Sequence, residues 1–135
     1  MTKSKDYIGS ELELFSHAKI WKQYRSQKIK LLIQGPVLEV GAGLGSNTKL
    51  LRDEQTVWHQ LEPDEKFYKQ LLKSNKKIEY CEAFNGFLKN HSKKNYQTII
   101  YIDVLEHIEK DRDELEIAAA KLIKGGCVIV LSPAH

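Results

Sequence analysis

Two patterns of apolar residues alternate along the chain. In one, apolar residues recur with a helical period, and in the other they form short continuous runs. Apolar residues three and four positions apart predict amphipathic helices, which begin near Ser10, Ser46, Pro63 and Asp111. The apolar runs predict strands at residues 37–41, 56–61, 77–81, 96–103 and 127–131. Runs of this kind are typical of strands buried on both faces. The alternation therefore predicts a parallel sheet covered by helices on both sides.

Local signals predict where several of these elements begin and end. Ser10 and Glu13 fit a capping box, and Pro63 suits the first position of a helix. Asp111 with Glu114 resembles another N-terminal cap, and Gly125 with Gly126 is expected to end that helix. Other residues are expected on buried helix faces: Leu12, Phe15, Trp21, Tyr24, Phe67, Tyr68, Leu71, Leu72, Leu115, Ala118, Ala119 and Leu122. Phe84, Phe87 and Leu88 suggest one further short helix.

Composition indicates one cytoplasmic domain that spans residues 1–135. The 41% hydrophobic content can bury a core without metal or disulfide support. Cys81 and Cys127 lie far apart in apolar runs, which predicts buried thiols in a reducing compartment. No apolar run has the length of a membrane span, and the N-terminus lacks the hydrophobic stretch of a signal peptide. We therefore expect no membrane insertion.

Charge and histidine placement argue against two further classes of site. The net charge of +3 is small, and the lysines alternate with neutral and acidic residues. This pattern favours a solvated surface over a nucleic-acid groove, which would gather cations and aromatics on one face. His17, His59 and His91 show no ligand spacing, so no metal is predicted.

Three glycines, Gly41, Gly43 and Gly45, lie where the first strand gives way to a helix. Glycine permits positive φ angles there and lets a ligand approach the backbone closely. In open α/β sheets this loop lies at the carboxyl end of the strand, where ligands bind. Glu62 follows the second strand about 20 residues later, where an acid can accept hydrogen bonds from a ribose. The pair predicts a nucleoside ligand, and an ordinary tight turn is the structural alternative.

Dinucleotide-binding enzymes are the main functional alternative. Their G-x-G-x-x-G fingerprint holds a helix N-terminus against a pyrophosphate. Here the spacing is G-x-G-x-G, and Ser46 stands where the last glycine of that fingerprint would lie. This departure favours a ligand without a pyrophosphate.

Four stretches together resemble class I S-adenosylmethionine-dependent methyltransferases in order and spacing. They are Val37–Gly45 (VLEVGAGLG), Gln60–Asp64 (QLEPD), Asp103–Ile108 (DVLEHI) and Lys124–Cys127 (KGGC). The resemblance implies a three-layer Rossmann-like parallel sheet of strand order 3-2-1-4-5. It also implies S-adenosyl-L-methionine as the cofactor, S-adenosyl-L-homocysteine as its product, and a methyl acceptor that the sequence does not identify.

The resemblance also assigns cofactor contacts to residues at the strand ends. The contacts expected for the methionine end of the cofactor are Glu39, Gly41, Ala42 and Gly43. Glu62 is expected to bind both ribose hydroxyls. Those for the adenine, in the turn after the third strand, are Glu82, Ala83 and Phe84. Those beneath the sulfonium are Asp103 and Val104.

Catalysis needs little beyond this site. Methyl transfer is an in-line displacement, so the protein mainly aligns the nucleophile and excludes water. A general base is required only for a protonated acceptor, and His107 is the nearest candidate. A local pair of exposed residues is the alternative for Glu106 and His107. Asp103 has an alternative role as a helix cap, and Glu39 as a surface charge.

The sequence ends four residues after the predicted fifth strand. Complete members of the family continue with another helix and with strands 6 and 7, so we expect a truncated gene product. An open fifth strand predicts self-association along its edge. The functional alternative to a methyltransferase is therefore a module that binds S-adenosylmethionine or S-adenosylhomocysteine without turnover.

Overall fold

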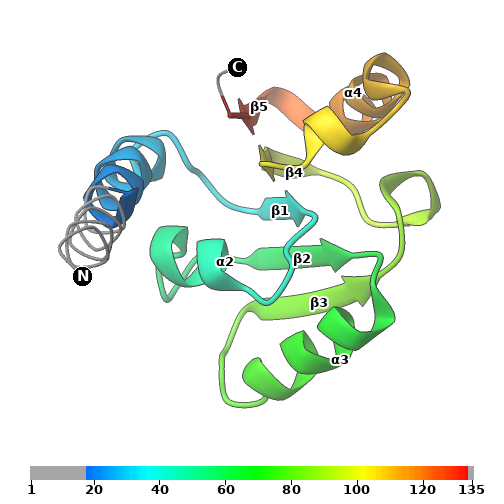
Figure 1. The fold of residues 1–135 in the computed structure, drawn as a ribbon. Helices are drawn as coiled ribbons and strands as arrows, with labels where there is room; N and C mark the ends of the chain where they lie inside the picture. The colour runs from blue at the N-terminus through cyan, green and yellow to red at the C-terminus, as the bar shows by residue number, and fades with distance from the viewer. Residues whose placement is uncertain (1–17, 134–135) are drawn as a thin grey trace, which may run out of the picture. The chain divides into compact units, whose positions relative to one another are not determined.

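The computed structural model describes residues 18–133 (Figure 1). The chain divides into two units, Met1–Leu32 and Ile33–His135. The predicted capping box at Ser10 and Glu13, together with Leu12, Phe15 and His17, lies outside the described residues.

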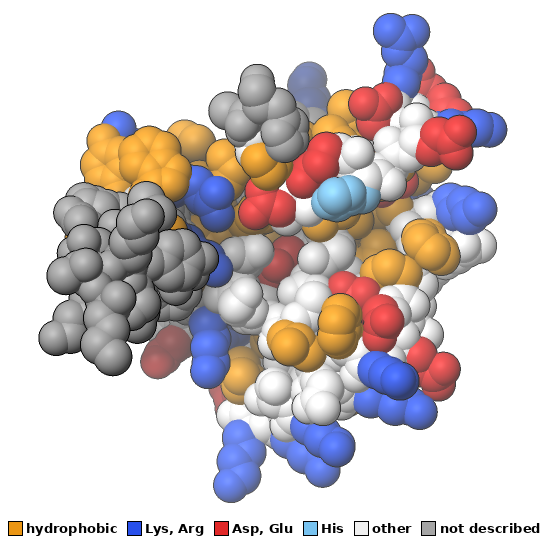
Figure 2. Space-filling model, in the orientation of Figure 1, with side chains coloured by type: hydrophobic (Ala, Val, Ile, Leu, Met, Phe, Trp, Pro, Cys, Tyr) orange, Lys and Arg blue, Asp and Glu red, His pale blue; other side chains and the backbone are white. Residues whose placement is uncertain are grey.

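The first unit contributes a helix over residues 18–30, followed by a turn in which the Leu32 N–H donates to the Ile29 carbonyl. Trp21 and Tyr24 stack with ring centroids 5.7 Å apart, yet 63% and 47% of their surfaces are exposed. The expectation that both are core contacts is therefore wrong. Figure 2 shows hydrophobic atoms beside Lys and Arg atoms at the surface of this helix.

The second unit is built on five parallel strands in the order β3-β2-β1-β4-β5, as predicted. They are β1 (Val37–Val40), β2 (Trp58–Glu62), β3 (Cys81–Asn85), β4 (Tyr96–Ile102) and β5 (Leu122–Leu131). The helices are α2 (Ser46–Leu51), α3 (Glu65–Ser74), α4 (Asp111–Ala120) and two 3-10 turns, η1 (Leu88–Asn90) and η2 (Leu105–His107). Because the strand order reverses between β1 and β4, their carboxyl ends form the crevice of an open α/β sheet.

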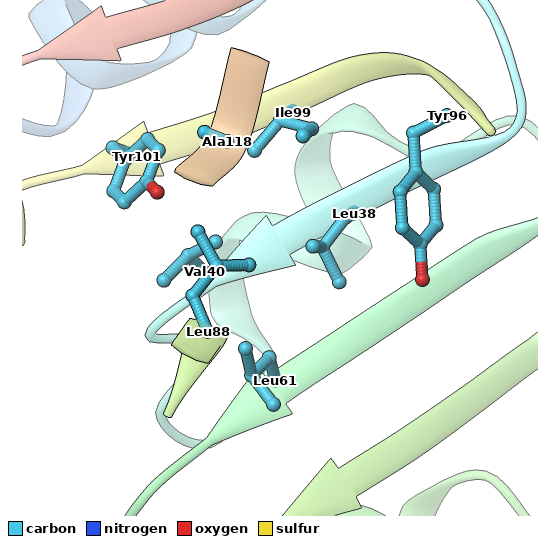
Figure 3. Packing of buried hydrophobic residues seen from close by; sticks show 8 residues of the cluster. All are labelled: Leu38, Val40, Leu61, Leu88, Tyr96, Ile99, Tyr101 and Ala118. Carbon is cyan, nitrogen blue, oxygen red and sulfur yellow. The ribbon is translucent and has the colours of Figure 1, made fainter. Parts of the chain in front are cut away.

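The alternation of side chains along β1 separates the two faces of the sheet. Leu38 and Val40 belong to a buried cluster that Ala118 of α4 covers (Figure 3). The remaining members of that cluster are Leu61, Leu88, Tyr96, Ile99 and Tyr101. Glu39, between Leu38 and Val40, points to the opposite face and bonds Thr48 of α2. Each face of β1 is therefore covered, which explains its continuous burial.

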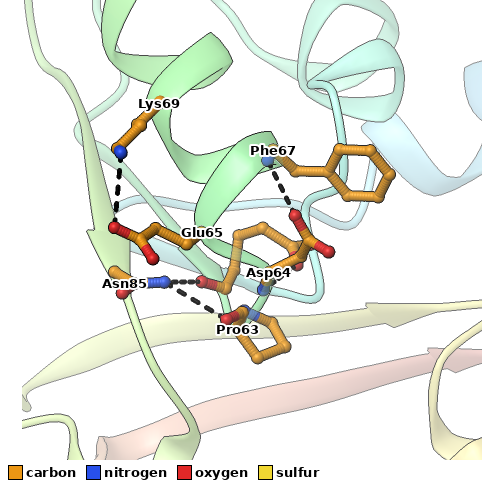
Figure 4. A network of polar contacts seen from close by, with 7 residues as sticks. Pro63, Asp64, Glu65, Phe67, Lys69 and Asn85 are labelled. Carbon is orange, nitrogen blue, oxygen red and sulfur yellow. Dashed lines mark hydrogen bonds and ion pairs between the residues drawn. The ribbon is translucent and has the colours of Figure 1, made fainter.

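Helix α3 begins two residues later than predicted. Asp64 is its N-cap and accepts a 3.0 Å hydrogen bond from the Phe67 N–H, so Pro63 lies before the cap (Figure 4). Of the predicted buried stripe, only Leu71 is fully buried. Phe67 and Leu72 are both 43% exposed.

Strand β3 begins at Cys81, where the predicted strand ended. Residues 77–80 form the turn before it, and Tyr80 has a φ of +64°. Pairing with β2 sets the register, with Cys81 opposite Trp58 and Asn85 opposite Glu62. Phe84 lies inside this strand, and the predicted short helix is the 3-10 turn η1.

Helix α4 and strand β5 also differ from the prediction. The N-cap of α4 is Lys110, without a side-chain cap, so Asp111 with Glu114 is not a capping pair. The helix ends at Ala120, and the strand begins at Leu122. Gly125 and Gly126 lie within β5, where the register passes from Leu122 opposite Tyr96 to Cys127 opposite Thr98. A Cβ on Gly126 would lie 2.9 Å from the Gln97 carbonyl oxygen, so the glycine permits this irregular pairing.

Strand β5 forms one edge of the sheet within the described part of the chain. Cys81 is buried as predicted, whereas Cys127 on this edge strand is exposed, so the prediction of a buried thiol there is wrong. Self-association along this edge stays a prediction.

Candidate functional site

A cavity of about 370 Å³ lies at the carboxyl ends of β1, β2 and β4. Its lining residues are Val40, Gly41, Leu61, Pro63, Gly86, Phe87, Leu88, Asp103, Val104, His107, Ile108 and Glu114. Four predicted site residues, Gly41, Asp103, Val104 and His107, therefore meet there. Its position matches the crevice where open α/β sheets bind ligands.

The glycine loop after β1 is held against the end of β2. The N–H groups of Gly41 and Ala42 both donate to the Leu61 carbonyl, at 2.8 and 3.1 Å. Gly41 has a φ of +72°, and a Cβ there would lie 2.6 Å from Val104 Cγ2. Gly43 has a φ of +60°, but a Cβ there would meet no atom within 4 Å. Gly41 is thus required by packing, whereas Gly43 faces open space that a ligand can enter.

Glu62 connects the glycine loop to the start of α3. Its Oε1 accepts a 2.7 Å hydrogen bond from the Gly43 N–H, and its Oε2 accepts a 2.8 Å bond from the Asp64 N–H. The side chain is 6% exposed. Two backbone donors therefore fix the orientation of the carboxylate. An ionised carboxylate has about four acceptor positions, so further donors can still bind it.

The segment after β4 closes the cavity from the other side. Asp103 has a φ of +57°, and its N–H donates to the Leu131 carbonyl at 2.8 Å. The residue before η2 is Val104, and no side chain caps that turn, so Asp103 is not a helix cap. His107 Nε2 lies 3.6 Å from Glu106 Oε1, and its side chain is 78% exposed. This is the local pair expected for these two residues.

Solved structures show what this arrangement resembles. The chain matches a glycopeptide N-methyltransferase, MtfA, complexed with S-adenosyl-L-homocysteine, with a TM-score of 0.69 and 19% identity over 80% of this chain. It also matches coclaurine N-methyltransferase bound to N-methylheliamine and S-adenosyl-L-homocysteine, with a TM-score of 0.71 and 17% identity over 84% of this chain. The plantazolicin methyltransferase BpumL follows, with a TM-score of 0.60 and 17% identity over 69%.

The chain has the Rossmann-like methyltransferase fold. Its sheet order agrees with that fold, as the resemblance implied. The chain spans 47% of the MtfA chain, 35% of the coclaurine N-methyltransferase chain and 37% of the BpumL chain. No protein-family model and no curated protein sequence matches it. Among helices of residues 18–133, none is both long and apolar enough to cross a bilayer.

The methyltransferase fold in this chain departs from the prediction at β3. Glu82, Ala83 and Phe84 are strand residues and do not form the turn after the strand. Ala83 packs with Ala42 and Leu71 in a small core cluster, whereas Glu82 is exposed. Phe84 packs between His59 and His91, with ring centroids 4.9 Å from each.

The turn at this edge of the sheet is instead Asn85–Gly86–Phe87. Asn85 Nδ2 donates to the carbonyls of Glu62 and Pro63, which ties the turn to the end of β2 (Figure 4). Gly86 and Phe87 line the cavity, and neither was predicted as a site residue. The Asn-Gly pair, a common turn signal, could have located them.

Glu39 lies on the far side of β1 from the main cluster and is 1% exposed. Its Oε1 accepts hydrogen bonds from the Thr48 hydroxyl at 2.5 Å and from Trp58 Nε1 at 3.0 Å. Burial raises the pKa of this carboxyl to about 7, and the two hydrogen bonds oppose that shift. Glu39 is therefore not a surface charge, and it does not line the cavity.

Glu39 belongs to a buried hydrogen-bonded chain beside a second cavity. Gln60 Nε2 donates to Thr48 Oγ1, Asn75 Nδ2 donates to Gln60 Oε1, and the Cys81 thiol reaches Asn75 Oδ1. The adjoining cavity of about 560 Å³ lies between α2 and α3. Because these amides and the Thr48 hydroxyl bond one another, and because no residue of β4 or of the segment after it lines the larger cavity, the smaller cavity is the candidate functional site.

The structure brings together two histidines to which the sequence assigned no role. The Tyr96 hydroxyl lies 2.8 Å from both His59 Nδ1 and His91 Nε2. Burial lowers the pKa of both imidazoles, to about 4 for His91, so both are neutral at pH 7. Within residues 18–133, no three His, Cys, Asp or Glu side chains are arranged to hold a metal ion.

Proposed function

We propose that the chain binds S-adenosylmethionine at the carboxyl ends of β1, β2 and β4 and transfers its methyl group to an acceptor. The observation that carries this proposal is the Glu62 carboxylate, oriented by the N–H groups of Gly43 and Asp64. The printed ligands of the MtfA and coclaurine N-methyltransferase structures, both bound to S-adenosyl-L-homocysteine, support the choice of cofactor.

The chemistry of the site fits this cofactor. Each Glu62 oxygen already accepts one backbone bond and has capacity for one more, so the carboxylate can accept both hydroxyls of a ribose. Gly43 and Gly86 have positive φ angles, and a Cβ on either would meet no atom. These two glycines leave room for the ligand beside the carboxylate. Asp103 and Val104 form the wall contributed by the segment after β4.

The residues around the cavity mainly exclude water and position the acceptor. When bound, the cofactor supplies an electrophilic methyl group on a sulfonium. Leu88, Val104 and Ile108 provide an apolar lining against which the reacting groups are desolvated. His107 is the proton acceptor that we assign for a methyl acceptor that arrives protonated, because this residue lines the same cavity.

Replacing Glu62 by alanine should weaken binding of S-adenosyl-L-homocysteine by roughly 1.5–3 kcal/mol, the range of a charged hydrogen bond. This corresponds to about a 10- to 150-fold rise in Kd. Calorimetric titration of the wild type and of Glu62→Ala measures the change. Glu65→Ala is the matched control, since Glu65 is exposed on α3 and its ion pair among the described residues is with Lys69, at 3.4 Å. Its Kd should not change.

Urea unfolding of each variant accompanies the titration, because Glu62 also orders the glycine loop. A folded wild type that gives no heat and no thermal shift with S-adenosyl-L-homocysteine would refute the proposed site. A folded Glu62→Ala variant with wild-type affinity would refute the role of the carboxylate alone.

Turnover separates a methyltransferase from a module that only binds the cofactor. Incubation with methyl-labelled S-adenosylmethionine and a panel of small metabolites, sugars, lipids and proteins tests it. Transfer to any of these acceptors supports the enzyme. Tight binding of S-adenosyl-L-homocysteine without transfer to the panel favours the binding module.

A further inference from the structure

We propose that the helix over residues 18–30, with Leu31 and Leu32, binds the surface of a membrane that contains anionic phospholipid. This segment has an apolar surface that is open to solvent. Exposed fractions are 62% for Ile20, 63% for Trp21 and 47% for Tyr24. Leu31 and Leu32, directly after the helix, are 86% and 64% exposed. Large apolar side chains gathered in this way are typical of an interaction surface.

The spacing of the three exposed apolar residues within the helix places them on one face. Ile20 and Tyr24 are four residues apart, and Trp21 and Tyr24 are three apart, so the side chains are neighbours. Trp21 and Tyr24 stack, and Lys28 Nζ lies 4.8 Å from the centre of the Tyr24 ring. The positive charge of Lys28 therefore lies beside the aromatic pair, where it can meet an anionic headgroup. Tryptophan and tyrosine favour the membrane interface, since each combines an apolar ring with a polar group.

The charge of the segment selects the kind of membrane. Residues 18–32 contain no Asp or Glu and five cations, Lys19, Lys22, Arg25, Lys28 and Lys30. The whole chain has a net charge of only +3, so the positive charge is concentrated here. Basic clusters on an amphipathic helix bind anionic lipid headgroups. Within the described residues 18–133, no helix is long and apolar enough to span a bilayer, and an orientation flat on the surface suits this segment.

Two other partners fit these observations less well. A nucleic acid would contact the cations and stack on the aromatics, but it would leave Ile20, Leu31 and Leu32 without a partner. A symmetric contact between two copies of the helix would bring like charges together. An anionic bilayer satisfies the cations and the aliphatic side chains at the same time.

Vesicle sedimentation with the full chain tests the proposal. We expect binding to vesicles that contain about one-third phosphatidylserine, weak binding to phosphatidylcholine alone, and release at high salt. Trp21 also reports binding by fluorescence, because the other tryptophan, Trp58, is fully buried. Its emission should shift to shorter wavelength only when anionic vesicles are added.

Variants at exposed positions separate the two contributions. Lys19→Glu with Lys30→Glu should lower the partition coefficient at least about tenfold. Lys76→Glu with Lys77→Glu is the matched control, since it makes the same charge change at exposed positions outside the segment and should leave partitioning nearly unchanged. Ile20→Ser with Leu31→Ser should abolish the Trp21 emission shift.

Three results would overturn the proposal. The first is equal binding to both kinds of vesicle, and the second is an equal loss in the Lys76 and Lys77 control. The third is an absence of vesicle binding by the folded chain, alone or together with tight binding of a labelled RNA. The test does not involve S-adenosylmethionine, so its outcome is independent of the proposed function.

Discussion

Replacing Gly41 by alanine is expected to lower the free energy of unfolding by about 2–4 kcal/mol. A φ of +72° is unfavourable for any residue with a Cβ, and the new methyl group would lie 2.6 Å from Val104 Cγ2 and 3.1 Å from Cγ1. Valine is branched at Cβ and has few χ1 alternatives, so Val104 cannot easily move away. Urea unfolding followed by the fluorescence of buried Trp58 measures the loss. Binding of S-adenosyl-L-homocysteine should fall as well, because both residues line the cavity.

Gly43→Ala is the matched control for this contact. Gly43 has a similar φ of +60°, but its Cβ would meet no atom, so only the backbone strain of about 1–2 kcal/mol applies. The double variant Gly41→Ala with Val104→Ala should recover part of the loss relative to Gly41→Ala. Equal destabilisation by Gly41→Ala and Gly43→Ala would contradict the role of the Val104 contact.

The central strands could be predicted from the sequence because a strand that is buried on both faces is a continuous apolar run. The run at residues 37–40 precedes the glycine loop, and the run at residues 96–102 precedes Asp103. Both runs form strands, as predicted. The strand order follows from the resemblance, and the meeting of Gly41 with Val104 follows from the strand order. Glu62 is similarly placed, because it ends a strand whose carboxyl end must lie beside that of β1.

The outer strands could not be predicted as well, because contacts with a neighbouring strand determine their bounds. Residues 77–81, which include Ile78, Tyr80 and Cys81, have the apolar pattern of a strand. In the structure, however, β3 begins only at Cys81, the residue that pairs with Trp58. Because the observed strand begins later than the predicted one, residues 82–84 lie within β3. The turn that follows contains Gly86 and Phe87, which were not predicted as site residues. The Gly125–Gly126 pair, which predicts a helix end, lies instead within β5. Its role in pairing with β4 involves the Gln97 carbonyl, which no local pattern reveals.

The environment of Glu39 could not be predicted from the local sequence either. The sequence indicates only that a carboxylate inside a buried strand is costly. The structure shows that the Thr48 hydroxyl and the Trp58 indole both donate hydrogen bonds to Oε1 of Glu39. Burial therefore outweighs hydrogen bonding and raises the pKa from 4.5 to about 7.

This raised pKa predicts that Glu39→Gln becomes more stable relative to the wild type as pH rises. Below pH 4.5 the carboxyl is neutral in both the folded and the unfolded state. Between pH 4.5 and about 7 the folded state binds more protons than the unfolded state, so the stability due to the neutral carboxyl is lost as pH rises. The difference between variant and wild type should grow by about 2–4 kcal/mol over this range and then level off.

Comparison of the two proteins is needed because His59 and His91 titrate in the opposite direction. Burial lowers the pKa of both, so their contribution to stability rises with pH over part of the same range and partly conceals the effect of Glu39. Subtracting the two unfolding curves at each pH removes the histidine contribution, which both proteins share. If the Glu39→Gln difference does not change with pH, then the carboxyl of Glu39 ionises in the folded protein as it does in water, and its burial carries no electrostatic cost.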